Sequence, residues 1–223
     1  MWSKLQVKIA QWAAIGILII LSVQMLKEIS GYEDGIERTV SREPKSGDTE
    51  MSDTKKAVLI IASQIFRDEE LFETQAALEA AGVCTVVASS KLGTCKGKLG
   101  AIAEATELVS DLKADDYDAI VFIGGNGAME YYDNAAALNL AKDAAGQGKV
   151  VAAICIAPRI LANAGLLEGI KATCYESEAE VIKKLGADFQ PNDVVRDGKF
   201  VTANGPHAAA DFGKTIAQAL AED

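Results

Sequence analysis

The chain has 223 residues, of which 49% are hydrophobic and 24% are charged, and its formal net charge at pH 7 is −10. This balance is that of a globular protein with room for one sizeable domain. The acidic charge argues against nucleic acid as a partner, because phosphate binding requires a basic surface.

The cysteine and histidine content bounds the possible metal sites. The four cysteines form no CxxC pair, and His207 is the single histidine of the chain. Most zinc sites built from cysteine and histidine are thereby excluded, and we expect no metal and no cofactor. An even number of cysteines permits disulfides, but a domain of this size does not need them, so reduced thiols are expected.

Residues 1–30 differ in composition from the rest of the chain. Within them, an uncharged run at 9–26 would reach about 27 Å as a helix, close to the thickness of a bilayer's hydrocarbon layer. We expect an uncleaved anchor helix rather than a signal peptide, because no clear small-x-small cleavage site follows the run. The prediction is a single-pass membrane-anchored protein whose orientation the basic residues do not decide. Residues 31–54 predict a flexible linker, and a product that starts at Met51 would be cytoplasmic.

From residue 55 to residue 223 the pattern alternates between strands and helices. Such alternation predicts an α/β domain whose mostly parallel sheet is covered by helices on both faces. Hairpins are expected near 96–100 and around Asp197-Gly198. Buried strands are expected at 57–62, 83–88, 119–123 and 150–154, and helices at 68–81, 135–146, 156–164, 178–185 and 208–220.

Cys155 stands where a predicted strand meets a predicted helix. The apolar run 150–154 suits a buried parallel strand, and the small residues Ala153 and Ala157 lie two positions before and after the cysteine. That spacing is typical of a nucleophile elbow. A helix that begins near Ile156 would lower the pKa of the thiol through its free N–H groups and its dipole. The alternative interpretation of this local pattern is an inert core cysteine.

Two further loops are expected beside Cys155, because open parallel sheets hold their sites beyond the C-terminal ends of the strands. The loop after Ala62 leads to Glu70, which by itself also fits a solvated acid in the first turn of a helix. The loop after Ile123 reads Gly-Gly-Asn-Gly over 124–127 and can turn bare N–H groups toward a reacting centre. A plain tight turn fits the same residues, and the spacing is not that of a nucleotide-binding loop.

Six segments of the domain resemble the ThiJ/PfpI family of the class I glutamine amidotransferase-like superfamily. No single segment is specific, but the six follow one another in the family's order and cover nearly all of residues 55–221. The resemblance implies a flavodoxin-like three-layer sandwich that assembles as a homodimer or a larger homo-oligomer. The segments are AVLIIA (57–62), FRDEEL (66–71), YDAIVFIGG (117–125), AICIAP (153–158), LANAGLLEG (161–169) and DGKFVTANGP (197–206).

The resemblance also implies a role for individual positions. Cys155 matches the reactive cysteine of the family, and Glu70 matches the acidic residue that contacts its sulfur. Gly125 and the backbone N–H of Ile156 match the donors that stabilise an oxyanion. Further candidates for the wall of the pocket are Asn126, Asn204 and His207.

The implied function is a cysteine-dependent glyoxalase or deglycase that acts on small reactive carbonyl compounds or on glycated protein. The alternative is a non-enzymatic oxidative-stress sensor or chaperone that uses the same cysteine. A cysteine peptidase is not favoured, because Ile156 stands where peptidase-type members have a histidine, and Cys174-Tyr175 where some other members have one. His207 could serve as a surrogate base, although a lone histidine at a helix start is more often a surface residue.

Overall fold

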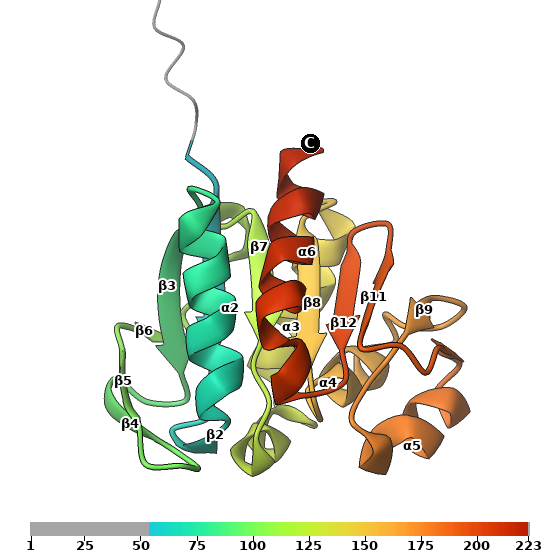
Figure 1. The fold of residues 1–223 in the computed structure, drawn as a ribbon, viewed down its shortest axis with the longest axis horizontal. Helices are drawn as coiled ribbons and strands as arrows, with labels where there is room; N and C mark the ends of the chain where they lie inside the picture. Colours follow the sequence, from blue (N-terminus) through green and yellow to red (C-terminus); the bar gives the residue numbers. More distant parts are fainter. Residues whose placement is uncertain (1–53, 223) are drawn as a thin grey trace, which may run out of the picture. The chain divides into compact units, whose positions relative to one another are not determined.

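The computed structural model describes residues 54–222, which belong to one compact unit of the chain. Its central sheet is parallel except for the edge strand β11, and the parallel strands point toward the bottom of Figure 1. The flavodoxin-like α/β fold expected from the sequence is therefore confirmed for the described residues. The strand order is β11 (Val194–Asp197), β12 (Phe200–Ala203), β8 (Val150–Ile154), β7 (Ala119–Phe122), β1 (Lys56–Ile60), β3 (Cys84–Ser89) and β6 (Glu107–Leu108).

Helices cover the sheet on both faces, which makes three layers (Figure 1). Two small sheets flank the central one, and the larger of them includes a hairpin that lies near the C-terminal strand ends. One face carries α2 (Asp68–Ala80) and α6 (Ala209–Ala221), and the other carries α3 (Ala135–Gly146) and α4 (Pro158–Asn163), while α5 (Ala179–Lys184) lies to the side. The small sheets consist of β2 (Gln64–Phe66), β4 (Gly93–Gly97) and β5 (Ile102–Ala105), and of β9 (Lys171–Ala172) and β10 (Asp188–Phe189).

Alternate residues of the central strands supply two separate hydrophobic cores. In β1, Leu59 packs in the same cluster as Phe212 of α6, whereas its neighbour Ile60 packs with Leu140 of α3. All four side chains are buried. A strand that is buried on both faces needs apolar residues at every position rather than at alternate ones. This explains why the sequence shows these strands as continuous apolar runs.

The close crossing of α2 and α6 fixes the position of α2 on the sheet. Gly213 of α6 lies against Thr74 and Ala77 of α2 with no room for a side chain. A Cβ atom at 213 would come within 2.7 Å of the Ala77 Cβ and 2.8 Å of the Thr74 carbonyl oxygen. The first turn of α2, which contains Glu70, is thereby held at the C-terminal edge of the sheet.

Several elements differ from the sequence-based expectation. The helix expected from Ile156 begins only at Pro158, because residues 155–157 form a turn. The short strands β2, β6, β9 and β10, of two or three residues each, were not predicted, since so few residues carry no hydrophobic period. The two expected hairpins are present as β4–β5 and β11–β12.

The predicted membrane anchor at 9–26 lies outside the described residues, as do the predicted anchor segment at 1–30 and all but the last residue of the predicted linker at 31–54. Within 54–222, no helix has both the length and the apolar composition needed to cross a bilayer. The longest helices there, α2 and α6, have 13 residues and reach only about 20 Å, short of a hydrocarbon layer of about 30 Å. For the described residues, this finding contradicts the membrane-anchored localisation inferred from the sequence.

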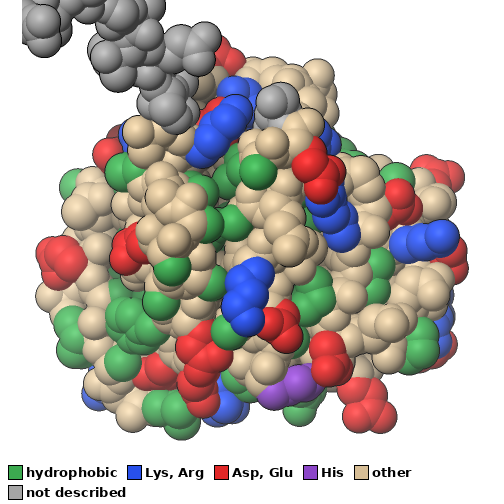
Figure 2. All heavy atoms as spheres, turned by 45° about the horizontal axis from the view of Figure 1, so that its top comes forward, with side chains coloured by type: hydrophobic (Ala, Val, Ile, Leu, Met, Phe, Trp, Pro, Cys, Tyr) green, Lys and Arg blue, Asp and Glu red, His purple; other side chains and the backbone are tan. Residues whose placement is uncertain are grey.

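Charged side chains of both signs are interspersed on the face of the molecule drawn in Figure 2. No large basic patch interrupts that face, and the chain as a whole carries a formal charge of −10. Proteins that bind nucleic acid instead gather lysine and arginine on one face or along one helix.

Candidate active site

Cys155 occupies a sharp turn at the C-terminal end of β8. Its φ angle is +65°, in the left-handed region that residues other than glycine rarely adopt. Two hydrogen bonds hold this conformation: the Cys155 N–H donates to the Ala203 carbonyl at 2.8 Å, and the Tyr175 N–H donates to the Cys155 carbonyl at 2.7 Å. Ala153 and Ala157 are fully buried on either side. The turn therefore has the strained geometry expected of a nucleophile elbow.

Glu70 lies beside the Cys155 sulfur with no exposed surface. One carboxyl oxygen, Oε2, accepts a hydrogen bond of 3.0 Å from the Gly124 N–H, and the carboxyl group also contacts the Cys155 thiol. The other oxygen, Oε1, has no nitrogen or oxygen partner among the described residues. Glu70 is thus not the solvated first-turn acid that its local sequence also allowed.

The glycine-rich loop after β7 joins these two groups. A Cβ atom at Gly124 would lie 2.5 Å from Oε2 of Glu70 and 2.6 Å from the Cβ of Cys155, so no side chain fits between them. Gly125 has a φ angle of +91°, and its backbone contacts the 65–67 segment too closely for a side chain. The Arg67 N–H donates to the Gly124 carbonyl at 3.0 Å. The three loops expected at this edge of the sheet are therefore packed against one another.

Burial makes Glu70 a weak acid. Desolvation is the largest cause, and it raises the pKa of the carboxyl from 4.5 to about 7, although the hydrogen bonds from Cys155 and Gly124 act in the opposite direction. Arg67, close in the same loop, also favours the ionised form. Near neutral pH the carboxyl group is therefore poised between its protonated and ionised states.

The pKa of Cys155 is raised rather than lowered, which corrects the sequence-based expectation. Burial is the largest cause and the ionised Glu70 is the next, and together they bring the pKa of the thiol to about 12. The N–H groups of Gly125 and Ile156 reach the sulfur and favour the thiolate, but they do not outweigh these two effects. The expected contribution of a helix dipole is small, because α4 begins at Pro158 and has only six residues.

Cys155 opens onto a cavity of about 400 Å³, although only 8% of the residue is exposed. Of the pocket residues inferred from the sequence, Asn126 lies in this cavity. Arg67 and Lys98 were not predicted. Arg67 could have been predicted, because it stands only three residues before Glu70 in the sequence. Lys98 could not, because it lies in a hairpin whose position in the sequence gives no indication of a contact with the Cys155 cavity. The remaining lining residues are Glu70, Gly125, Ile156, Tyr175, Ser177 and Pro206.

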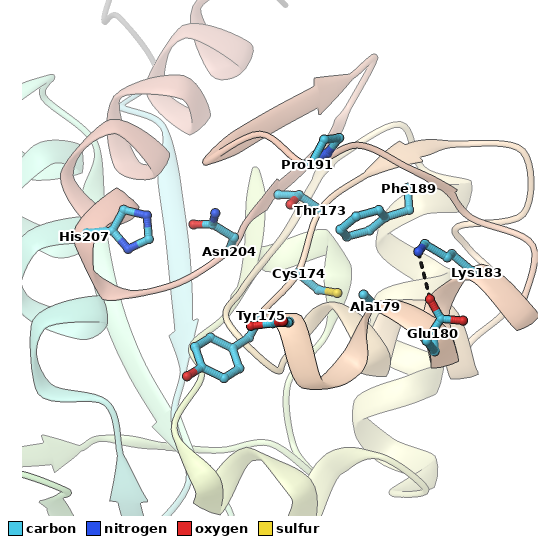
Figure 3. A pocket seen from close by; sticks show the side chains of 11 residues that line it. Thr173, Cys174, Tyr175, Ala179, Glu180, Lys183, Phe189, Pro191, Asn204 and His207 are labelled. Carbon is cyan, nitrogen blue, oxygen red and sulfur yellow. Dashed lines mark hydrogen bonds and ion pairs between the residues drawn. The ribbon is translucent and has the colours of Figure 1, made fainter.

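Asn204 and His207 line a second cavity, of about 580 Å³, which shares Tyr175 with the first. Figure 3 shows both side chains on one side of this cavity, opposite Phe189 and Lys183. The His207 ring is exposed, and its Nε2 lies 3.1 Å from a carboxylate oxygen of Asp193. The structure therefore does not bring His207 into the cavity that holds Cys155.

The chemistry available at Cys155 is that of a thiol, a carboxyl group and backbone N–H donors. Within residues 54–222 no group of three or more histidine, cysteine or acidic side chains is placed to hold a metal ion. All four cysteines are free thiols: Cys84 is exposed, and Cys95, Cys155 and Cys174 are buried.

Comparison with known proteins places this site in context. The sequence model described as the DJ-1/PfpI family matches residues 55–219. An uncharacterized protein of Methanocaldococcus jannaschii is 42% identical over 168 residues, which cover 74% of this chain and 82% of that protein. A deglycase of Pyrococcus abyssi is 34% identical over 149 residues, 67% of this chain and 90% of the deglycase. The crystal structure of a ThiJ/PfpI domain protein from Brachyspira murdochii superposes with a TM-score of 0.74 at 35% identity, over 76% of this chain and 98% of that one.

Proposed function

This chain belongs to the DJ-1/PfpI family, and on that premise we propose that it acts on small reactive carbonyl compounds with Cys155 as the nucleophile. One observation carries the proposal. The sulfur is in contact with a buried carboxyl group, that of Glu70, and with the backbone N–H groups of Gly125 and Ile156. The name of the Pyrococcus abyssi relative, a deglycase, supports this substrate class and extends it to glycated protein.

The reactive form is the one in which Glu70 keeps a proton while Cys155 has lost its own. An ionised Glu70 raises the pKa of the thiol, so protonating the carboxyl removes that repulsion. Because the two groups touch, a single proton is shared between them, and the first pKa belongs to the pair rather than to either residue. The N–H groups of Gly125 and Ile156, which reach the sulfur, favour the state in which the proton is on Glu70 and Cys155 is a thiolate.

With glyoxal as substrate, the thiolate sulfur forms a bond to one aldehyde carbon, and the carbonyl oxygen takes the proton from Glu70. This gives a hemithioacetal and leaves Glu70 ionised. The carboxylate then removes the hydrogen of that carbon as a proton and returns it to the neighbouring carbon. The hydroxyl proton of the first carbon moves to the oxygen of the second, so that the first carbon becomes a carbonyl and the second an alcohol. The product is a thioester of Cys155, and attack by water releases glycolate and restores the thiol. The net reaction adds one water molecule and needs no external oxidant.

The test is the turnover of glyoxal by the purified chain, followed as glycolate formation. Wild-type protein should convert glyoxal, and Cys155→Ala should lose the activity to the level of buffer. Cys84→Ala is the matched control, because it also removes one thiol but lies exposed at the start of β3. Equal turnover by wild type and Cys155→Ala would refute the proposal.

A second function fits the same contacts: Cys155 as a peroxide sensor. Two molecules of hydrogen peroxide would each be reduced to water while the sulfur is oxidised to a sulfinate. The N–H groups of Gly125 and Ile156 and a protonated Glu70 could donate hydrogen bonds to the sulfinate oxygens. After mild peroxide, mass mapping should show two added oxygen atoms on the peptide that carries Cys155 in wild type and none on the same peptide of Cys155→Ala. Unmodified Cys155 in folded, peroxide-treated protein would exclude this function.

A further inference from the structure

The cavity at Cys155 has a cationic wall made by two separate segments of the chain. Arg67 comes from the loop before α2, and Lys98 comes from the turn between β4 and β5. The Arg67 guanidinium makes two hydrogen bonds to the Glu69 carboxylate, at 2.8 and 3.1 Å, which neutralise much of its charge. The Lys98 ammonium lies 3.5 Å from the side-chain oxygen of Asn126, a neutral partner, and forms no ion pair within the described part of the chain.

The backbone of Lys98 is fixed, unlike that of an ordinary surface lysine. Asp68, a buried residue in the first turn of α2, accepts hydrogen bonds of 2.8 Å from both the Leu99 N–H and the Ala101 N–H. The Lys98 N–H itself donates to the Phe66 carbonyl at 2.8 Å. The turn is thereby tied to the helix that carries Glu70, and the backbone of Lys98 is fixed beside the cavity that its side chain lines.

The charge on Asp68 reinforces this connection. Its burial opposes ionisation, but the N–H groups of Leu99 and Ala101, together with its own N–H and the charge of Arg67, lower the pKa of the carboxyl group. A carboxylate that accepts two backbone hydrogen bonds is a strong anchor for a turn. Asp68 is therefore a positioning residue for Lys98, while Glu70, two residues later in the same turn, contacts the sulfur.

We propose that Lys98 binds an anionic group on the substrate, so that the preferred substrates are small carbonyl compounds that carry a carboxylate or a phosphate. This inference rests on the proposed function of Cys155. A thiolate repels an anionic reagent, and a lysine at the cavity wall offsets that repulsion. The Lys98 ammonium has three N–H donors, of which Asn126 occupies at most one. Phosphate and carboxylate share this chemistry, since both present oxygen acceptors with negative charge.

The test compares two alkylating reagents of nearly equal size at Cys155: iodoacetate, which is anionic, and iodoacetamide, which is neutral. The rate ratio of iodoacetate to iodoacetamide at Cys155 is measured on the full chain at 0.15 M salt by mass mapping of the peptide that carries Cys155, which separates it from the exposed Cys84. We expect Lys98→Gln to reduce this ratio about threefold to tenfold relative to wild type. Lys96→Gln is the matched control, because Lys96 is exposed on the same hairpin and does not line the cavity. It should leave the ratio within about twofold, since surface charges are screened over about 8 Å at this salt.

The outcomes separate this inference from the proposed function. A ratio that Lys98→Gln lowers and Lys96→Gln does not would support the anion site, whether or not the protein converts glyoxal. A ratio that is the same in wild type and Lys98→Gln would overturn the anion site, and glyoxal turnover that depends on Cys155 would still stand. An equal fall of the rate ratio in Lys98→Gln and Lys96→Gln would also overturn the anion site, because the ratio would then depend only on the overall charge of the hairpin.

Discussion

Replacing Glu70 by glutamine should remove a large pH dependence from the stability of the protein. In the folded state the pKa of Glu70 is about 7, against an ordinary value of 4.5, chiefly because the carboxyl group is buried. A pKa that is higher in the folded state means that folding favours the protonated form. The stabilising effect is therefore complete below pH 4.5 and is lost as the pH rises toward 7. At about 1.4 kcal/mol per pKa unit, the loss is of the order of 3 kcal/mol.

The assay is urea unfolding between pH 4.5 and pH 8, followed by circular dichroism, which reports the helices and strands of residues 54–222. Glutamine keeps an oxygen for the Gly124 N–H and stays neutral, so it imitates the protonated acid. The free energy of unfolding of Glu70→Gln relative to wild type should rise by roughly 3 kcal/mol across this range. Glu73→Gln, exposed on the same helix, should change by less than about 0.5 kcal/mol. A constant difference between Glu70→Gln and wild type at all pH values would refute the reasoning.

Three further substitutions test how the site is held. Gly213→Ala should lower the free energy of unfolding by about 1–3 kcal/mol, because its Cβ would meet the Thr74 carbonyl oxygen at 2.8 Å; an unchanged urea midpoint would show that the helix crossing can relax. Asp68→Ala should cost about 1–3 kcal/mol, because two backbone N–H groups lose their acceptor, and it should also lower the iodoacetate preference. Gly124→Ala should abolish glyoxal turnover, since its Cβ would enter the space of Glu70; retained activity would mean that this contact is not needed.

The sequence was sufficient to predict the α/β architecture. It also predicted that the loops after Ala62 and Ile123 and the turn at Cys155 lie together at the C-terminal edge of the sheet. Continuous apolar runs such as 150–154 identify strands that are buried on both faces, and parallel strands bring their C-terminal ends to one edge. Cys155 could be placed on a sharp turn because a strand gives way there to helix-forming residues within a few positions. Local pattern alone could not choose between the buried and the solvated interpretation of Glu70. That choice depends on Gly124 and Cys155, which are 54 and 85 residues away along the chain.

Burial and long-range pairing explain what the sequence could not supply. The pKa of Cys155 was expected to be low because of a helix N-terminus, but desolvation and the Glu70 carboxylate, which act only in the folded state, raise it instead. Lys98 lies at the cavity because Asp68 binds the turn that carries it. The hydrophobic pattern of the sequence gives no sign of such a long-range hydrogen bond. His207 was expected near the site because it directly follows the family segment 197–206, yet its ring pairs with Asp193 beside the neighbouring cavity.

The raised pKa of Cys155 does not make the thiol inert. Burial is its largest cause, but the ionised Glu70 carboxylate adds to it, and that part is removed when Glu70 takes a proton. Cys155 and Glu70 share one proton. When that proton moves from the sulfur to Glu70, the Glu70 carboxylate, which accepts one backbone hydrogen bond from the Gly124 N–H, loses its negative charge. The transfer places the charge on a sulfur that two N–H groups reach, those of Gly125 and Ile156. The number of donors therefore favours the reactive form, while the higher intrinsic pKa of a thiol opposes it. Reactivity at this site is accordingly set by small changes in the environment of the pair, such as an anionic group drawn in by Lys98.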